Sequence, residues 1–255
     1  MMDTTDFNSY FKGRKYIITG GSSGIGYEVA KMLSILGAKL ILIGRDTHKL
    51  ERIRLDLERP YDHLVVELDL FNTDNVRLVI NKIHDEVGSL SGLVYSSGIS
   101  PIMPLRTIKY ENLDKTMRVN FYSFVEMVKH YSNRKYSNKG SIVAISSTAS
   151  AMPEKGQTIY SSSKAALEAS VKCMAIELSE RNIRINSVLP GIIKTEMTER
   201  FAKNNSNKFL DLQAKKQLFG LGKPSDIANF VVFLLSDMSV FCTGRSYFAD
   251  GGRIL

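Results

Sequence analysis

The sequence predicts an α/β fold in which a doubly wound parallel sheet is flanked by helices. Two features predict it. Short apolar runs, most of them rich in β-branched residues, alternate from end to end with longer segments whose apolar residues recur every three or four positions. The 255 residues are 44% hydrophobic and 24% charged, which is typical of a globular protein with a sizeable core. No linker rich in Pro, Gly or Ser divides the chain, so we expect one domain over residues 1–255.

The elements are predicted in order along the chain. Six apolar runs are too short for buried helices and are mostly flanked by Gly, Asn, Asp or Ser, which predicts parallel strands at 16–18, 40–43, 64–66, 93–95, 142–145 and 183–188. Helical apolar spacing predicts helices at 24–36, 47–58, 73–87, 109–134 and 157–180. The interval 195–222 has no clear period, and long intervals of this kind are usually lids or binding loops. We therefore expect a substrate lid at 195–222, with surface decoration as the alternative.

Lysine and arginine exceed aspartate and glutamate by 34 to 26, a net charge of +8, which raises nucleic acid, a membrane surface and an anionic substrate as partners. The basic residues are spread along the chain, which favours solvated helix faces, so we expect neither nucleic acid nor membrane as a partner. The apolar stretch at 227–235 is too short to span a bilayer. Cys173 and Cys242 provide no disulfide framework and no zinc cluster, and the first residues show no signal-peptide pattern. These observations predict a cytoplasmic protein without a metal.

A glycine-rich segment at 19–26, Thr-Gly-Gly-Ser-Ser-Gly-Ile-Gly, follows the first predicted strand and opens the first helix. Its glycines allow a tight turn and let backbone N–H groups approach a pyrophosphate, while the helix N-terminus supplies partial positive charge. A Gly-Ser turn alone could be an ordinary connector, but its place between strand and helix favours dinucleotide binding. The candidate residues are Gly20, Ser22, Ser23, Gly24, Ile25 and Gly26.

Tyr160 and Lys164 are four residues apart on a predicted helix and therefore lie one turn apart on one face. A nearby ammonium favours the phenolate, so Lys164 can lower the pKa of Tyr160 and make it the general acid in reduction and the general base in oxidation. Ser147, at the carboxyl end of a predicted strand, would hydrogen-bond the substrate carbonyl and stabilise the developing oxyanion. A Tyr-x-x-x-Lys pair alone is more often a core-edge tyrosine beside a solvated lysine. Ser147 and the phosphate loop favour the catalytic interpretation.

Gly20, Gly24 and Gly26 fit the pattern T-G-x-x-x-G-x-G, and with this match the chain resembles the short-chain dehydrogenase/reductase family. Further matches follow in the family's order over nearly the whole chain, at Asp69, Asn120, Ser147, 160–164, 190–195 and 250–252. The likeness is greatest to the branch of 3-oxoacyl-carrier-protein reductases and related carbonyl or sugar-alcohol dehydrogenases. The resemblance implies a Rossmann-type fold and an NAD(P)-dependent oxidoreductase that interconverts a ketone and a secondary alcohol.

The resemblance also implies roles for individual residues. It assigns Lys164 to the nicotinamide ribose hydroxyls and Asn120 to a water-linked proton relay toward that lysine; the amide of Asn120 could also bridge or kink a helix. Asp69 would take the adenine amino group with Leu70 packed beside it, or would instead cap the helix that begins near Thr73. The backbone after the sixth strand would pass along the nicotinamide, and its candidate contacts are Pro190, Gly191, Ile193 and Thr195, the last to the carboxamide.

One segment departs from the family pattern. Where similar proteins have Asn-Asn-Ala-Gly after the fourth strand, this chain has Tyr95, Ser96, Ser97 and Gly98. Gly98 keeps the close backbone approach, and the two serines keep room for a cofactor, so we expect Ser97 and Gly98 to contact it. The lost amide side chain would normally tie neighbouring strands together.

The end of the second predicted strand favours NADP(H) over NAD(H). An NAD site places a carboxylate there to bond the adenosine ribose, and this chain has Gly44. Arg45 follows and can clamp a phosphate or stack on adenine. Three observations favour the alternative: Asp46 could turn inward, Ser23 is not basic, and Arg45 could be an exposed turn residue.

The leading hypothesis is therefore an NADP(H)-dependent oxidoreductase that reduces a ketone, similar to a 3-oxoacyl-thioester reductase. Its partner would be a small carbonyl or alcohol substrate, free or linked to a carrier protein or CoA. The alternatives are an NAD(H)-dependent dehydrogenase of a sugar or small polyol and a non-catalytic regulator that senses dinucleotides. Specificity is expected in 100–104, 150–157 and the lid.

Proteins that the chain resembles are dimers or tetramers, built through the long helices here at 109–134 and 157–180 and through a final helix and strand. The stretch 227–235 is apolar almost all round and is followed by Phe241, Tyr247 and Phe248. This is more apolar surface than one sheet face readily covers, so we expect a homotetramer.

Overall fold

Seven parallel strands form one sheet in the computed structural model, which describes residues 9–137, 139–205 and 209–253. Their order across the sheet is β3-β2-β1-β4-β5-β6-β7, so the direction of strand succession reverses between β1 and β4. The strands are β1 Lys15–Thr19, β2 Lys39–Gly44, β3 Leu64–Glu67, β4 Gly92–Tyr95, β5 Gly140–Ile145, β6 Ile183–Pro190 and β7 Ser246–Ala249. Each of the first six contains one predicted run, and the predicted fold class is confirmed.

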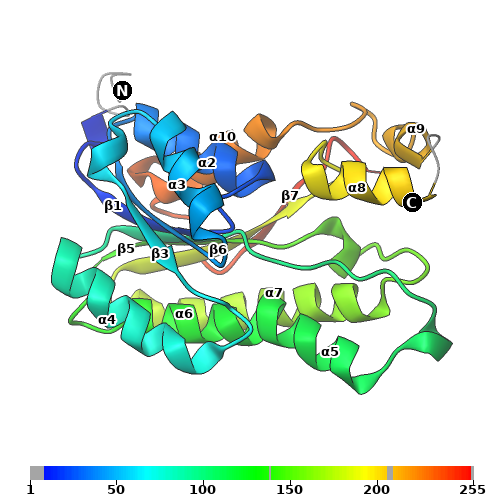
Figure 1. The fold of residues 1–255 in the computed structure, drawn as a ribbon, viewed down its shortest axis with the longest axis horizontal. Coiled ribbons are helices and arrows are strands. Elements are labelled where there is room, and N and C mark those ends of the chain that lie inside the picture. The colour runs from blue at the N-terminus through cyan, green and yellow to red at the C-terminus, as the bar shows by residue number, and fades with distance from the viewer. Residues whose placement is uncertain (1–8, 138, 206–208, 254–255) are drawn as a thin grey trace.

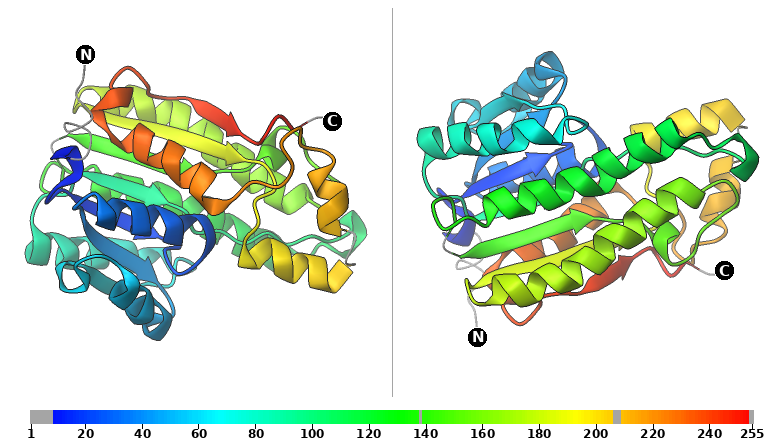
Figure 2. Two further views of the ribbon diagram at one scale, coloured as in Figure 1. Left: turned by 90° about the horizontal axis from the view of Figure 1, so that it is seen from above. Right: turned by 90° about the horizontal axis from the view of Figure 1, so that it is seen from below.

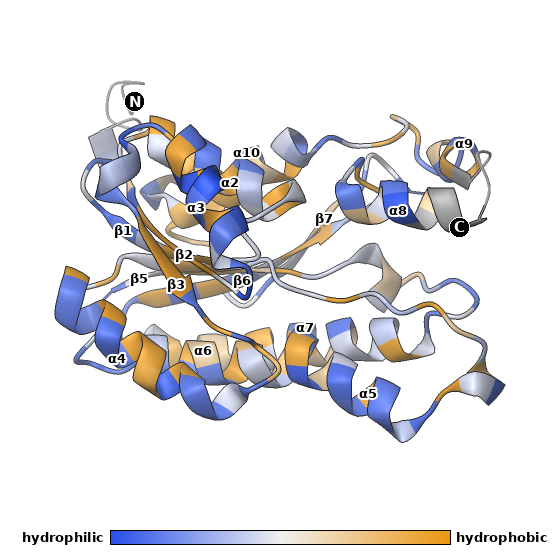
Figure 3. Ribbon diagram, viewed as in Figure 1, coloured by the Kyte–Doolittle hydropathy of each residue, from blue (hydrophilic) through white to orange (hydrophobic). Residues whose placement is uncertain are grey.

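Helices cover both faces of this sheet (Figures 1 and 2). One face carries α2 Gly24–Ile35, α3 Thr47–Asp56 and α10 Pro224–Leu235, and the other carries α4 Val76–Val87, α5 Tyr110–Met117, α6 Ser123–Tyr131 and α7 Thr158–Ser179. Because successive strand side chains point to opposite faces, Ile17 packs into a core with Phe124, and Ile18 packs into the other core with Val29. Figure 3 shows the strands as largely hydrophobic segments between these two layers. Burial on both faces explains why the strands have continuous apolar runs.

The predicted helix at 109–134 is interrupted. A π turn, Arg118–Tyr122, separates α5 from α6, and Asn120 lies within it. Turns of this kind widen a helix by one residue and are often found at functional sites. The predicted helix at 73–87 also differs at its start, because a 3₁₀ turn, Thr73–Asn75, precedes α4.

The interval 195–222 contains two helices, α8 Glu196–Asn205 and α9 Phe209–Ala214, with 206–208 outside the described residues. They lie beyond the carboxyl ends of the strands (Figure 1). The acidic residues Glu196 and Glu199 in the first turn of α8 favour its N-terminus. Helix α8 has few apolar residues, of which Met197 is half-exposed, and α9 has only six residues, so the interval shows no sustained helical pattern in the sequence. Within the described residues, every helix is too short or too polar to cross a membrane.

Candidate active site

A cavity of about 1340 Å³ opens at the carboxyl ends of the strands. Doubly wound sheets bind ligands at this edge, near the point where strand succession reverses. Typical ligand pockets have roughly 300–1,000 Å³, so this cavity has room for a dinucleotide and a small second ligand. The predicted site residues that line it are Gly20, Ser22, Ser23, Gly24, Ile25, Arg45, Asp69, Leu70, Ser97, Gly98, Ser147, Tyr160, Lys164, Pro190, Gly191, Ile193 and Thr195. The other two, Gly26 and Asn120, lie directly behind this lining.

The phosphate loop between β1 and α2 requires its glycines. Gly20 and Gly24 have φ values of +69° and +55°, the left-handed region that glycine adopts without strain. A Cβ at Gly26 would lie 2.3 Å from the carbonyl oxygen of Gly20, so only glycine lets α2 pack this closely. Ser23 caps α2 without a side-chain hydrogen bond, and no acidic residue lies in the first turn. The N–H groups at this helix start therefore face the cavity without a competing carboxylate, which fits a pyrophosphate.

The end of β2 brings two basic side chains to the cavity. Arg45 lines it, and so does Lys49 in the first turn of α3, a residue that sequence reasoning missed. The Nζ of Lys49 lies 3.3 Å from a carboxylate oxygen of Glu196 at the start of α8. Asp46 also lines the cavity, but its carboxylate accepts a 2.8 Å hydrogen bond from the backbone N–H of Lys49 and so caps α3. Lys49 follows Arg45 by four residues at the start of a helix, and this spacing is the signal that could have identified Lys49 from the sequence.

Asp69 forms a turn after β3. Its Oδ1 accepts a hydrogen bond of 3.1 Å from the backbone N–H of Phe71, and its side chain is exposed at the cavity. It does not cap the turn that begins at Thr73, whose N-cap residue is Asn72.

Tyr160 and Ser147 both line the cavity, where the Ser147 hydroxyl influences the pKa of the Tyr160 phenol. Burial raises the pKa of Tyr160, and the Ser147 hydroxyl opposes that rise, so the net shift is opposite in direction to the decrease expected from Lys164. Lys164 is only 3% exposed, and its Nζ donates a 2.7 Å hydrogen bond to the carbonyl oxygen of Ile145. Burial lowers the pKa of Lys164 to about 8, although Glu168 one turn further along α7 opposes the decrease. The ammonium lies 6.0 Å from the centre of the Tyr160 ring.

Asn120 is fully buried and bridges the π turn to the loop after β4. Its Oδ1 accepts from the N–H of Ile99 at 2.8 Å, and its Nδ2 donates to the carbonyl of Ile99 and to the Ser163 hydroxyl, both at 2.9 Å. A Cβ at Gly98 would lie 3.3 Å from the Asn120 oxygen and 3.4 Å from the Lys164 ammonium nitrogen. Gly98 thus keeps the space between these two groups open.

Tyr95, in the segment that departs from the family pattern, links β4 to the π turn through its hydroxyl. This fully buried tyrosine donates a hydrogen bond of 2.5 Å from its hydroxyl to the carbonyl oxygen of Val119 in the π turn, and it also contacts the Ser123 hydroxyl. The Thr19 hydroxyl accepts hydrogen bonds from the N–H groups of Ser96 and Ser97 at 3.2 and 3.3 Å. Through these bonds, β4 is joined to β1 and to the π turn that carries Asn120.

A polar cluster that sequence reasoning missed lies at the end of the cavity away from β2 and β3. It consists of Glu154, Gln213 and Arg253, all of which line the cavity, together with Lys216. Glu154 accepts from Arg253 at 2.7 Å, from Lys216 at 2.9 Å and from the Gln213 amide at 3.2 Å. Burial raises the pKa of Glu154, but the hydrogen bonds and charges of its partners outweigh burial and lower it. No sequence pattern could have found this cluster, because Arg253 is 99 residues from Glu154.

Comparison with known proteins shows likeness over the full chain. A family model described as enoyl-(acyl carrier protein) reductase matches residues 20–253. A 3-oxoacyl-[acyl-carrier-protein] reductase of Thermotoga maritima is 31% identical over 253 residues, which cover 96% of this chain and 99% of that protein. The crystal structure of a dehydrogenase/reductase from Sinorhizobium meliloti superposes with a TM-score of 0.89 at 29% identity, covering 98% of this chain and 99% of the other. L-sorbose reductase from Gluconobacter frateurii, complexed with NADPH and L-sorbose, has a TM-score of 0.87 at 26% identity, covering 96% and 98% of the two chains.

Proposed function

The chain belongs to the short-chain dehydrogenase/reductase family, and from this premise we propose that it reduces a ketone to a secondary alcohol with NADPH, or catalyses the reverse reaction. The observation that carries the proposal is that Tyr160, Ser147 and the buried Lys164 line the same cavity as the glycine-rich phosphate loop. The oxidation of NADPH in the presence of ketones tests it. Because the relatives at 31% identity include 3-oxoacyl-[acyl-carrier-protein] reductases, an acetoacetyl thioester belongs among the ketones assayed.

The proposed chemistry divides between cofactor and protein. The nicotinamide, when bound, supplies the hydride. Ser147 hydrogen-bonds the substrate carbonyl oxygen, and Tyr160 gives that oxygen a proton as negative charge develops on it. The raised pKa of Tyr160 suits this role, because the phenol stays protonated at neutral pH until the oxyanion forms. Lys164 binds the nicotinamide ribose, and Asn120 takes part in returning a proton toward Lys164.

The cofactor contacts are proposed on the same grounds. The phosphate loop holds the pyrophosphate, Asp69 and Leu70 hold the adenine, and the segment from Pro190 to Thr195 holds the nicotinamide. The cavity accommodates this assignment because its walls at Gly20, Gly24 and Gly98 are backbone, where a side chain would fill the space. Helices α8 and α9, which border the cavity, are proposed to act as the substrate lid of a single catalytic domain.

We further propose that NADP(H) is preferred over NAD(H). Three features support this: Gly44 offers no carboxylate, Arg45 and Lys49 offer positive charge, and the carboxylate of Asp46 is occupied in capping α3. A relative of 26% identity has been crystallised with NADPH.

Substitutions at the end of β2 are expected to change this preference. Arg45→Ala should lower the ratio of kcat/KM for NADPH to that for NADH by at least about tenfold, because a charge-assisted bond to the 2′-phosphate is lost. Gly44→Asp should reverse the ratio; its Cβ would be 3.2 Å from Leu50, which a small movement accommodates. Arg52→Ala, on the exposed side of α3, is the control and should leave the ratio unchanged. A wild-type preference for NADH would contradict the proposal.

A homotetramer is proposed as the state in solution. Exposed apolar side chains lie on α7 and around β7, including Ile176 at 76% exposure and the fully exposed Phe241. Light scattering should give about four times the chain mass of 28.6 kDa. Ile176→Asp should lower that mass, whereas Leu78→Asp, at a 60% exposed site on α4, should not. A wild-type monomer at micromolar concentration would refute this assembly.

The two unpaired cysteines are compatible with a cytoplasmic location, which we also propose.

A further inference from the structure

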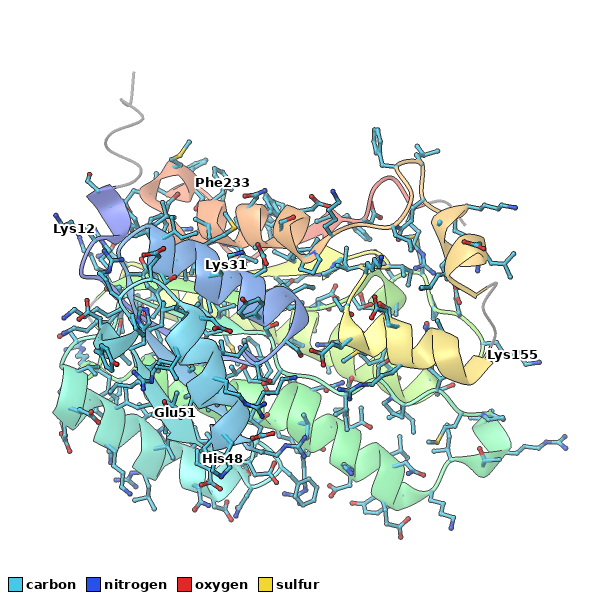
Figure 4. The ribbon with its side chains drawn as sticks, turned by 45° about the horizontal axis from the view of Figure 1, so that its top comes forward. Lys12, Lys31, His48, Glu51, Lys155 and Phe233 are labelled. Carbon is cyan, nitrogen blue, oxygen red and sulfur yellow. The ribbon has the colours of Figure 1, made fainter. Side chains whose placement is uncertain are left out.

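The polar cluster lies at the end of the cavity opposite the adenosine-binding end. The proposed adenosine contacts follow β2 and β3, at one edge of the sheet. Glu154 comes from the loop between Ser147 and Tyr160, and Arg253 follows β7, at the other edge. Figure 4 shows Lys155, the neighbour of Glu154 in the chain, at the end of the molecule that carries α8 and α9. A substrate whose carbonyl meets Tyr160 therefore extends toward the polar cluster.

Two members of the cluster have buried side chains, and all four are held together by hydrogen bonds. The side chain of Arg253 is 7% exposed, and Gln213 is 4% exposed. Glu154 is bonded to Arg253, Lys216 and the Gln213 amide, so one carboxylate is surrounded by two cations and one neutral donor. The other half of the Gln213 amide is unsatisfied: its Oε1 is buried without a hydrogen-bond partner. A buried acceptor without a partner is costly unless a ligand or water supplies a donor.

We propose that the cluster recognises the hydroxyl groups of a neutral, hydroxyl-rich ketone. A hydroxyl group can donate to the Gln213 Oε1 and can also accept from Arg253, so one kind of group satisfies both sides of the site. This inference rests on the proposed function and names its substrate class.

Two other substrate classes fit the cluster less well. An alkyl chain would leave the Gln213 oxygen unpaired and would remove water from Arg253 and Glu154 without replacing it. A carboxylate has no proton to donate to Gln213 and would lie against Glu154, which is ionised because its partners lower its pKa. The apolar residues Ile99, Ile102 and Ile192 also line the cavity and would cover the carbon skeleton of the substrate.

Matched four-carbon ketones test the proposal with NADPH as reductant. The wild-type protein should show a kcat/KM for 1,3,4-trihydroxybutan-2-one at least about tenfold above that for butan-2-one, and also above that for the N-acetylcysteamine thioester of 3-oxobutanoate. Gln213→Met keeps the side-chain length and removes the amide. In this variant the advantage over butan-2-one should fall by about tenfold or more, while the Kd for NADPH stays within about threefold of wild type. Asn81→Leu is the control, because its amide oxygen is also buried without a partner but lies on α4, outside the cavity lining.

The outcomes separate this inference from the function it rests on. Turnover of butan-2-one or the thioester at a kcat/KM equal to or above that of the hydroxylated ketone would overturn the substrate class and leave ketone reduction standing. An equal loss on both four-carbon ketones in Gln213→Met would show that the cluster only anchors α9, and would also overturn it. NADPH binding without oxidation by any of the three ketones would overturn the proposed function itself.

Discussion

The Tyr160→Phe variant should bind NADPH with nearly unchanged affinity and lose at least about 100-fold in turnover, the contribution typical of a general acid or base. The change removes one hydroxyl and little volume. Tyr160 lines the cavity together with Ser147, and burial raises its pKa, so its hydroxyl is protonated at neutral pH and can give a proton in reduction. The measurement is steady-state NADPH oxidation, with the Kd for NADPH from fluorescence titration.

Tyr136→Phe is the matched control. Tyr136 is 6% exposed and precedes the amino end of β5, whereas the cavity lies at the carboxyl ends of the strands. Its variant should therefore keep wild-type turnover. Near-wild-type turnover of Tyr160→Phe would mean that another group transfers the proton.

Replacing Lys164 with methionine should have opposite effects on catalysis and on stability. Turnover should fall by at least about tenfold, because the positive charge beside Tyr160 is lost. The free energy of unfolding of the cofactor-free protein should rise at pH 7. Burial lowers the Lys164 pKa from 10.5 to about 8, which corresponds to a cost of about 3 kcal/mol for the buried ammonium. The variant also loses the hydrogen bond to the Ile145 carbonyl, which destabilises it by about 1 kcal/mol. The net increase in the free energy of unfolding is therefore about 2 kcal/mol, and the expected rise in Tm is about 4–8 °C.

The pH dependence of this gain has a definite sign. Below about pH 8 the lysine is protonated in both the folded and the unfolded chain, and the folded state carries the full cost. Above about pH 10.5 it is neutral in both states, and the cost disappears. Wild-type stability due to this group therefore rises between these pH values, and the advantage of Lys164→Met shrinks over the same interval. Lys82→Met, at an exposed position of α4, is the control and should change neither turnover nor Tm. A Tm of Lys164→Met at or below that of wild type at pH 7 would contradict this account.

The strands could be predicted because burial on both faces leaves continuous apolar runs, and Ile17 and Ile18 pack into separate cores as that pattern requires. Helices α8 and α9 could not, because α8 has few apolar residues and α9 has only six residues, too few in each to establish a helical pattern. The π turn at Asn120 was also not predictable, since one extra residue in a helical turn does not disturb the spacing of apolar residues enough to be recognised.

The candidate site was predictable wherever its residues follow strands or lie one helical turn apart. Parallel strands bring their carboxyl ends to one edge, so Gly98, Ser147 and Pro190 line one cavity although they are distant in the sequence. Contacts between unrelated loops leave no such pattern. The pairing of Glu154 with Arg253 depends on how the loop before α7 and the segment after β7 fold over the same opening.

The central claim is that a hydride passes from NADPH to a carbonyl carbon in this cavity. Isotope transfer tests that claim most directly. The protein is incubated with NADPH that carries deuterium at both C4 positions of the nicotinamide and with the trihydroxybutanone, butanone and thioester described above. The account predicts NADP⁺ and a secondary alcohol in equal amounts, with one deuterium on the carbinol carbon. Saturable binding of NADPH with no NADP⁺ and no deuterated alcohol from any of the ketones, as expected of a protein that only senses the dinucleotide, would contradict it.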